Sequence, residues 1–272
     1  MNDFEFLRFV TIGQYLPTGS IIHRLDPRAR LLAGLLLLIA VTAAPRGMGL
    51  GVALVALFVL LVVARIPIGY ALKGLAPPLP FLAFLAALQV LFGPREAARL
   101  LVVWGPVYIS PMSLLNGTLL VVRFAALILT ISLTSFCIST TEIVRGLEAL
   151  LAPFTKIGLP THDFVLMIQV TLRFLPLLAQ EAERIAKSQA SRGAEWGTGR
   201  GGLLRRTRQA FPLLVPLFLT SLQRAENLAL AMEARGYQGG KGRTSMVVLH
   251  FRWADAVALS LVVALSTMIV LV

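Results

Sequence analysis

Long apolar blocks follow one another along the chain. Five of them, 14 to 27 residues long, are bounded by charged or turn-forming residues. A helix needs about 20 apolar residues to cross a hydrocarbon core of about 30 Å. The pattern therefore predicts an all-α, polytopic membrane protein with about five spanning helices. The blocks are residues 31–44, 48–64, 71–92, 112–138 and 253–272.

Two of these blocks have internal features that a plain spanning helix lacks. Pro77, Pro78 and Pro80 lie in the third block, where a helix is expected to be kinked or to begin only after Pro80. Arg123 lies in the fourth block, and a cation at the centre of a spanning helix costs roughly 2.5 to 3.5 kcal/mol. A functional ion site is one interpretation of Arg123. We favour the other, in which its side chain snorkels or packs inside the helix bundle.

The composition excludes a soluble globular protein. Of the 272 residues, 57% are hydrophobic and 14% are charged, against averages of about 45 to 50% and about 25% in soluble domains. The net charge is +12, and the positive-inside rule accounts for basic loops in a membrane protein. Only four of the 25 cations are lysines, and they are not clustered with aromatic residues, so we expect no nucleic-acid partner.

The charges also indicate how the chain is divided. Arg28 and Arg30 precede the first span, and Arg65 and Lys73 follow the second, which places the N-terminus in the cytoplasm. Residues 142–245 hold 14 Lys and Arg and 8 Asp and Glu, so this stretch must largely be in water. We predict a membrane domain over 1–141 with about four spans, a cytoplasmic domain over 142–245 and a final span within 246–272.

The predicted cytoplasmic domain contains two long helices, one ending near 192 and one near 235. Each is apolar in one half and rich in charged residues in the other, and the glycine-rich residues 197–202 form a flexible linker between them. They are too polar to be simple spans. Their similarity suggests a pair that works as a unit.

A short motif occurs at the end of each long helix. Ordinary helix capping explains a single copy, because glycine after the last turn adopts a left-handed conformation and a nearby arginine complements the helix dipole. Two copies, with the arginines 43 residues apart, predict two exposed cationic groups on one cytoplasmic face. The motifs are Ser191-Arg192-Gly193 and Ala234-Arg235-Gly236.

An apolar stripe on the second long helix predicts its contact with the first. Ala225 and Ala229, four residues apart, are small enough to let two helices cross closely. We therefore predict that this stripe packs on the helix over 162–192. Its members are Leu214, Phe218, Leu222, Ala225, Ala229 and Met232.

Candidate catalytic residues are scarce. His23, His162 and His250 lie far apart and at no metal-ligand spacing. The run at 197–202 lacks the Gly-Lys-Ser/Thr that a phosphate-binding loop needs. We expect no enzymatic activity, no catalytic residue, no metal and no cofactor, and any ATPase must be another polypeptide.

The chain resembles the transmembrane coupling (T) component of energy-coupling factor (ECF) transporters, the EcfT/CbiQ family. The similarity covers nearly the whole chain, and Ser191 stands where the family usually has alanine. It rests on Gly13-Gln14-Tyr15, His23-Arg24-Leu25-Asp26-Pro27-Arg28, Leu172-Arg173-Phe174-Leu175-Pro176 and the segment from Glu226 to Tyr237.

The resemblance implies a set of partners. The two coupling helices of the family cross in an X, and each motif arginine binds an acidic groove on one of two ABC ATPase subunits. That implies Arg192 and Arg235 as the ATPase-binding residues. The proline-rich membrane half would hold a membrane-embedded substrate-binding S component, in the prokaryotic cell membrane and for vitamin uptake.

Two other transport functions remain open. A T subunit dedicated to cobalt or nickel shares the arginine motifs. A conventional ABC importer permease should have one coupling loop per chain rather than two Arg-Gly helix ends. A membrane enzyme would need a polar catalytic cluster near the spans, and the sequence contains none.

Overall fold

The computed structural model describes residues 15–45, 47–92, 102–104, 107–158, 160–193, 203–239 and 249–272. The chain forms two compact units, which are described separately. The bundle unit comprises residues 13–149 and 248–272, and the helix-pair unit is built on residues 150–247. The predicted linker at 197–202 lies outside the described residues.

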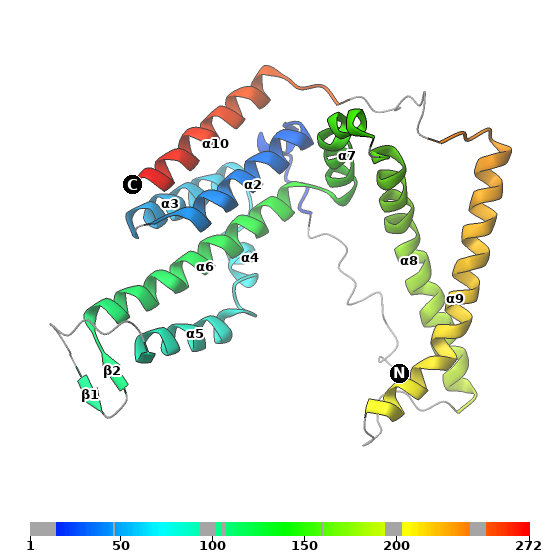
Figure 1. The fold of residues 1–272 in the computed structure, drawn as a ribbon, viewed down its shortest axis with the longest axis horizontal. Coiled ribbons are helices and arrows are strands. Elements are labelled where there is room, and N and C mark those ends of the chain that lie inside the picture. Colours follow the sequence, from blue (N-terminus) through cyan, green and yellow to red (C-terminus); the bar gives the residue numbers. More distant parts are fainter. Residues whose placement is uncertain are drawn as a thin grey trace. The chain divides into compact units, whose positions relative to one another are not determined.

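The bundle unit consists almost entirely of helices (Figure 1), which confirms the predicted all-α membrane fold. In chain order its helices are η1 (Ile22–Arg24), α2 (Pro27–Ala43), α3 (Gly47–Val63), α4 (Ile68–Lys73), α5 (Leu79–Phe92), α6 (Pro111–Cys137), α7 (Thr140–Leu151) and α10 (Trp253–Leu271).

A short hairpin interrupts the helical pattern between α5 and α6. Strands β1 (Val102–Trp104) and β2 (Val107–Ile109) pair antiparallel, with Val102 opposite Ile109. Among the described residues, these two strands form a sheet of their own.

Helices α2 and α6 run antiparallel, and an arginine on each contacts the end of the other. Arg30 near the start of α2 donates from Nη1 to the carbonyl of Cys137, the last residue of α6, at 2.5 Å. Arg123 on α6 donates from Nη2 to the carbonyl of Ala44, the C-cap of α2, at 2.5 Å. Helix C-termini carry carbonyls without intrahelical partners. The Arg123 side chain is half-buried, and its hydrogen bond to Ala44 supports the interpretation in which it packs against the bundle rather than forming an ion site.

Glycine permits the close approach of these helices. A Cβ at Gly34 on α2 would lie 2.6 Å from Oγ1 of Thr134 on α6, closer than non-bonded atoms can stand. A Cβ at Gly49 on α3 would come even closer to the backbone carbonyl oxygen of Ile269 on α10. Both positions therefore require glycine for steric reasons.

Helices α2 and α10 begin side by side and run parallel. The buried carboxylate of Asp255 accepts hydrogen bonds from the backbone N–H of Asp26 and from that of Arg252, both at 2.7 Å. Asp26 in turn caps α2 by accepting from the N–H of Arg28 at 2.9 Å. Since α2 and α10 start at the same end of the bundle, they also leave it at the same end.

An ion pair attaches α7 to the bundle. The buried Arg30 donates to Glu142 through Nη2 at 2.8 Å and through Nη1 at 3.3 Å. Burial by itself would raise the pKa of Glu142, but the hydrogen bonds from Arg30 and Ser139 and the charge of Arg30 hold that pKa below its ordinary value. Glu142 is therefore ionised at neutral pH.

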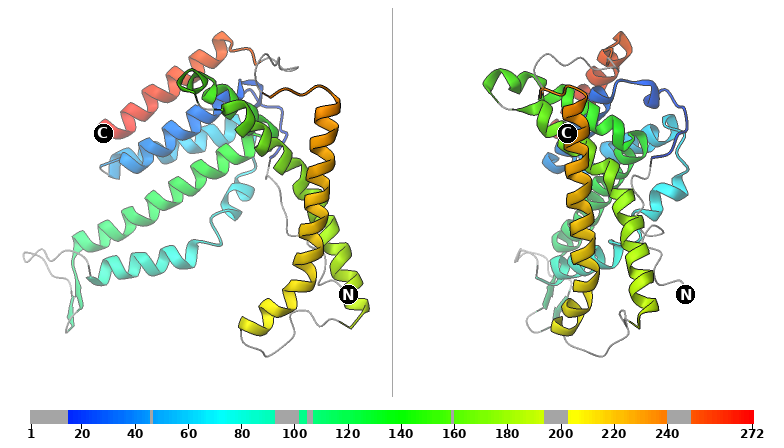
Figure 2. Two further views of the ribbon diagram at one scale, coloured as in Figure 1. Left: turned by 45° about the vertical axis from the view of Figure 1, so that its right-hand side comes forward. Right: turned by 90° about the vertical axis from the view of Figure 1, so that its right-hand side faces the viewer.

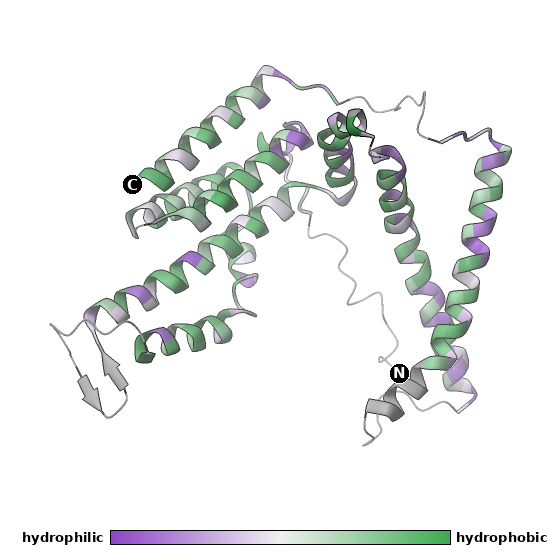
Figure 3. Ribbon diagram, in the orientation of Figure 1, coloured by the Kyte–Doolittle hydropathy of each residue, from purple (hydrophilic) through white to green (hydrophobic). Residues whose placement is uncertain are grey.

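The bundle is apolar both inside and outside. Its core includes Leu50, Leu57, Phe136 and Ile269, while large apolar side chains are also exposed on the outer faces of α3, α5, α6 and α10. Figure 3 shows the same apolar character around these helices. A bilayer is the solvent that such an exterior requires.

Among the described residues, three helices are long and apolar enough to cross a membrane: α6, α8 and α10. Helices α3 and α5 are apolar but only 17 and 14 residues long. Helix α8 qualifies because its first half is apolar, although the sequence assigned this segment to the cytoplasmic domain. Length and composition alone do not distinguish a span from a half-apolar helix.

The helix-pair unit contains η2 (Ala152–Ile157), α8 (Thr161–Ser191) and α9 (Leu203–Ala234). Figure 2 shows α8 and α9 crossing at an angle rather than lying parallel along their length. Pro176 lies inside α8, and Pro212 and Pro216 lie inside α9. Polar residues occur along both helices (Figure 3), in contrast to the spans of the bundle unit.

Candidate partner-binding site

The first Arg-Gly motif is the C-terminus of α8. Arg192 is the C-cap, and Gly193 follows with φ +86°. The N–H of Gly193 donates to the carbonyl of Ala190 at 3.0 Å, and that of Arg192 donates to the carbonyl of Gln189 at 3.1 Å. The predicted left-handed glycine is confirmed here.

The second motif ends α9 in the same way. Gly236 has φ +75°, and its N–H donates to the carbonyl of Glu233 at 2.9 Å. The N–H of Tyr237 donates to the carbonyl of Met232 at 3.0 Å. These two bonds form a Schellman motif, which satisfies carbonyls at the end of the helix and reverses the chain. The direction of Arg235 is therefore set by hydrogen-bonded backbone.

Both arginines are available to a partner. All six motif residues, from Ser191 to Gly193 and from Ala234 to Gly236, are exposed. Within the described part of the chain, neither the Arg192 nor the Arg235 guanidinium has a hydrogen bond or an ion pair. A guanidinium has five donors in a planar fork that matches a carboxylate.

The two motifs lie at opposite ends of the helix pair. Arg224 on α9 contacts Glu181 on α8 at 3.4 Å, and Tyr237 donates to Asp163 in the first turn of α8 at 3.4 Å. These contacts make the helices antiparallel, as Figure 1 also shows. Arg192 is at the other end of α8, whose 31 residues span about 45 Å at a rise of 1.5 Å per residue.

The structure places Ala225 and Ala229 away from the contact between the helices. Both alanines are exposed, whereas Arg224 and Leu228, one position before each, are half-buried. Since Arg224 contacts Glu181, its side of α9 faces α8. Residues next to each other in a helix point about 100° apart, because a turn holds 3.6 residues.

The rest of the predicted apolar stripe is exposed as well. Leu214, Phe218 and Leu222 have exposed fractions of 54%, 64% and 51%, and only Met232 is half-buried. The stripe is therefore a free face of α9 within this unit. A charge pair, which the periodicity of apolar residues does not register, occupies the contact instead.

Two residues of the site were not assigned a role from the sequence. Asp163 is not among the predicted site residues, and Tyr237 is named there only as the end of the segment that resembles the family. The 74 residues between them leave no local signal from which their hydrogen bond could be predicted.

The described residues contain no group of three or more His, Cys, Asp or Glu side chains arranged to hold a metal ion. His23 makes a local hydrogen bond of 2.7 Å to Ser20. The chemistry available at the two helix ends is the binding of anions by exposed guanidinium groups.

Comparison with known proteins places this architecture in a class. A polytopic helical membrane protein with two Arg-Gly helix ends matches, over residues 18–246, the model of the family CbiQ, described as "Cobalt transport protein". The chain therefore belongs to the CbiQ family, which includes the energy-coupling factor transporter transmembrane proteins EcfT.

Individual relatives agree with this assignment. The chain is 40% identical over 240 residues to the energy-coupling factor transporter transmembrane protein EcfT of Heliobacterium modesticaldum, covering 88% of each chain. It is 37% identical over 255 residues to the EcfT of Listeria innocua, covering 94% of this chain and 95% of the relative. With the EcfT of Acidaminococcus fermentans it shares 36% identity over 260 residues, covering 96% and 95%.

Proposed function

We propose that this chain, a transmembrane T component of an ECF transporter, couples two cytoplasmic ABC ATPases to a separate substrate-binding protein in the membrane. Arg192 and Arg235 each bind an acidic groove on one ATPase subunit. The observation that carries the proposal is the pair of exposed arginines without partners among the described residues, at opposite ends of one antiparallel helix pair.

The separation of the arginines supports two binding partners rather than one. A distance of about 45 Å along α8 exceeds the reach of a single groove and suits two subunits side by side. A charge-assisted pair between guanidinium and carboxylate is roughly twice as strong as a neutral hydrogen bond. Both helix ends are the same in chemistry, which fits two related partners.

The helix pair transmits motion because its ends have defined geometry. When two ATPase subunits approach or separate, each carries one helix end with it, and the contact between Arg224 and Glu181 joins the two movements. The exposed apolar face of α9, with Leu214, Phe218 and Leu222, offers a surface to the substrate-binding membrane protein. In this proposal the chain itself performs no chemical step.

The proposed cargo is a vitamin, released when the substrate-binding protein reorients. A dedicated cobalt or nickel transporter is the second candidate, since the matching family model carries the description of a cobalt transport protein. Identifying the proteins that co-purify with this chain from native membranes, by mass spectrometry, separates the two candidates.

The test of the proposal is reversal of both charges, Arg192→Glu with Arg235→Glu. Losing one interfacial charge pair costs about 2 to 5 kcal/mol, so each single variant should bind the ATPases at least about thirtyfold more weakly. The double variant should reach the membrane but fail to capture them. Arg184→Glu, an exposed arginine on the same helix, is the matched control and should bind normally. Capture by the double variant at wild-type yield would refute the docking assignment.

A further inference from the structure

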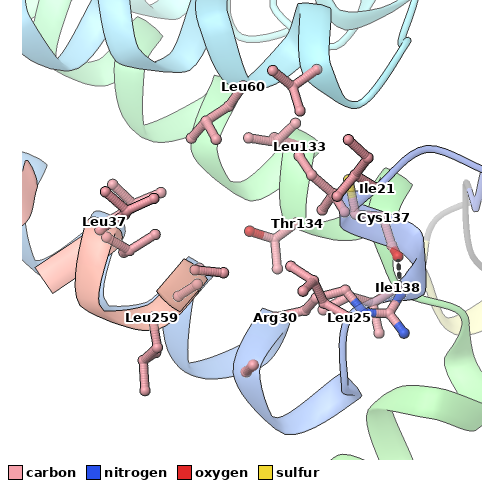
Figure 4. Close-up of a pocket in the computed structure, with 18 of the residues that line it drawn as sticks. Ile21, Leu25, Arg30, Leu37, Leu60, Leu133, Thr134, Cys137, Ile138 and Leu259 are labelled. Atoms are coloured by element: carbon pink, nitrogen blue, oxygen red, sulfur yellow. Dashed lines mark hydrogen bonds between the residues drawn. The ribbon is translucent and has the colours of Figure 1, made fainter. Parts of the chain in front are cut away.

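A cavity of about 500 Å³ lies inside the bundle unit, between α2, α3, α6 and α10 (Figure 4). Its walls are almost entirely aliphatic, with Leu37, Leu60, Leu133 and Leu259 among them. Three other lining residues, Ile21, Val257 and Leu261, are 73%, 52% and 66% exposed. The cavity therefore opens to the outside of the bundle.

An aliphatic cavity of this size is a poor site for water, because each buried water needs two to four polar partners. The polar groups on its wall are few. The Thr134 hydroxyl is already bonded to the carbonyl of Thr130 at 2.9 Å. In a membrane, lipid acyl chains surround the opening of such a cavity. An acyl chain can enter the cavity and fill it by dispersion contacts.

One end of the cavity is polar. Arg30 lines that end together with Leu25 and Ile138 (Figure 4). Its Nη1 and Nη2 bind Cys137 and Glu142, but its Nε is buried and has no partner.

Two more cations lie on the surface near the same end of the cavity. The hydrogen bond between Asp26 and Asp255 brings the start of α2 beside the start of α10. Arg24 and Arg252, close to these aspartates in sequence, are exposed, and Trp253 is 87% exposed. Arginine and tryptophan are typical of the membrane interface, and basic pockets on the cytoplasmic side of helical bundles bind anionic headgroups.

We propose that this cavity binds one anionic phospholipid of the cytoplasmic leaflet. One acyl chain lies between α2, α3, α6 and α10, and the phosphate lies against Arg24 and Arg252. Bound there, the lipid fills the gap beside Arg30, the residue that holds α7 to the bundle. The proposal is independent of the ATPase contacts.

The experiment uses the full-length chain in nanodiscs that contain equal amounts of phosphatidylglycerol and phosphatidylcholine with identical acyl chains. Native mass spectrometry then counts the lipids retained. Ala258→Trp fills the cavity, since Ala258 lines it. Ala264→Trp adds the same bulk to an exposed position of α10 that is not part of the lining. Arg24→Ser with Arg252→Ser removes the cations and leaves the cavity intact.

The wild type and Ala264→Trp should each retain one phosphatidylglycerol, and Ala258→Trp should retain about tenfold less. The double serine variant should keep a lipid but lose the preference for phosphatidylglycerol. Equal retention by the two tryptophan variants would overturn the cavity assignment. An unchanged headgroup preference in the serine variant would overturn the assignment of the phosphate to Arg24 and Arg252.

A second measurement does not depend on any variant folding. Phosphatidylglycerol with a photoreactive diazirine in its acyl chain should label Leu37 and Leu133, which line the cavity from α2 and α6. Labelling confined to the outer faces of the bundle would refute the proposal. So would a photo-crosslinker at position 259 that captures a protein helix instead of lipid in cell membranes.

Discussion

The hydroxyl of Tyr237 donates a hydrogen bond to the carboxylate of Asp163, with 3.4 Å between Oη and Oδ1. Tyr237 is also the residue whose N–H closes the Schellman motif at the end of α9. One residue therefore both terminates α9 and attaches that end to the first turn of α8. The position of Arg235, two residues earlier, depends on this attachment.

Tyr237→Phe keeps the ring and removes the hydroxyl. A hydrogen bond of this kind contributes about 0.5 to 1.5 kcal/mol, so under the proposed function we expect the affinity for the ATPase bound by Arg235 to fall by about three- to tenfold. Titration of the purified ATPase against the chain in detergent measures this affinity. Tyr70→Phe, on α4 in the bundle unit, is the control. An unchanged affinity in Tyr237→Phe would show that the hydroxyl does not position Arg235.

The two motif glycines should tolerate asparagine but not valine. At φ +75°, Gly236 has a conformation that costs most residues about 1 to 2 kcal/mol and that asparagine adopts more readily. The surroundings are open, with no atom within 4 Å of a Cβ at Gly236, so the penalty comes from the backbone alone. Gly236→Val should weaken ATPase capture, and Gly236→Asn should retain most of it. Equal loss in both variants would mean that side-chain bulk, not helix termination, matters there.

Removing Arg30 should destabilise the bundle unit. Arg30→Met leaves Glu142 without its partner and the carbonyl of Cys137 without its donor. Breaking a fully buried pair from one side costs about 3 to 5 kcal/mol, and replacing both partners costs much less. Since the Glu142 side chain is half-buried, the cost here should lie below that range. We therefore expect a lower melting temperature in detergent for Arg30→Met than for Arg30→Met with Glu142→Gln. Lys73→Met, an exposed cation at the end of α4, should leave the melting temperature unchanged.

The same ion pair makes stability depend on pH. The pKa of Glu142 in the folded chain lies below its ordinary value of 4.5, so its contribution is complete above that value and is lost as the pH falls through the folded-state pKa. Wild-type stability should therefore decrease on acidification below about pH 4.5, and Glu142→Gln should show a smaller decrease over the same range. Glu226→Gln, exposed on α9, should retain the wild-type profile. Identical profiles for the wild type and Glu142→Gln would contradict this assignment.

Local sequence signals predicted the features that depend on local geometry. Block length and hydropathy predicted the helical membrane fold. They did not predict the short hairpin of β1 and β2. Gly193 and Gly236 were predicted correctly as left-handed caps, because helix termination is decided within a few residues. The chemistry of the candidate site, two exposed arginines, follows from the same short segments.

Contacts between helices were not accessible in this way. The interpretation of Ala225 and Ala229 assumed that the apolar stripe faces α8, whereas Arg224 and Glu181, 43 residues apart, form the contact. The rotation of a helix about its axis depends on the partner that covers it. A helix that borders water, lipid and protein can turn its apolar face toward lipid or toward protein, and the sequence pattern is the same in both cases. The surroundings of Arg123 likewise depend on helix packing, because its partner is the carbonyl of Ala44, 79 residues away in sequence.

The sequence by itself determined the apolar, helical character of the membrane segments, the points at which two long helices end and the family to which the chain belongs. Only the tertiary structure decided that Arg192 and Arg235 lie at opposite ends of an antiparallel pair, that Arg30 joins α2, α6 and α7, and that an aliphatic cavity opens beside it. The physical reason is the distance along the sequence over which each interaction acts. Caps and spans are stabilised within one turn or one helix, whereas these contacts join residues 43 to 112 positions apart, and only the packing of the helices brings such residues together.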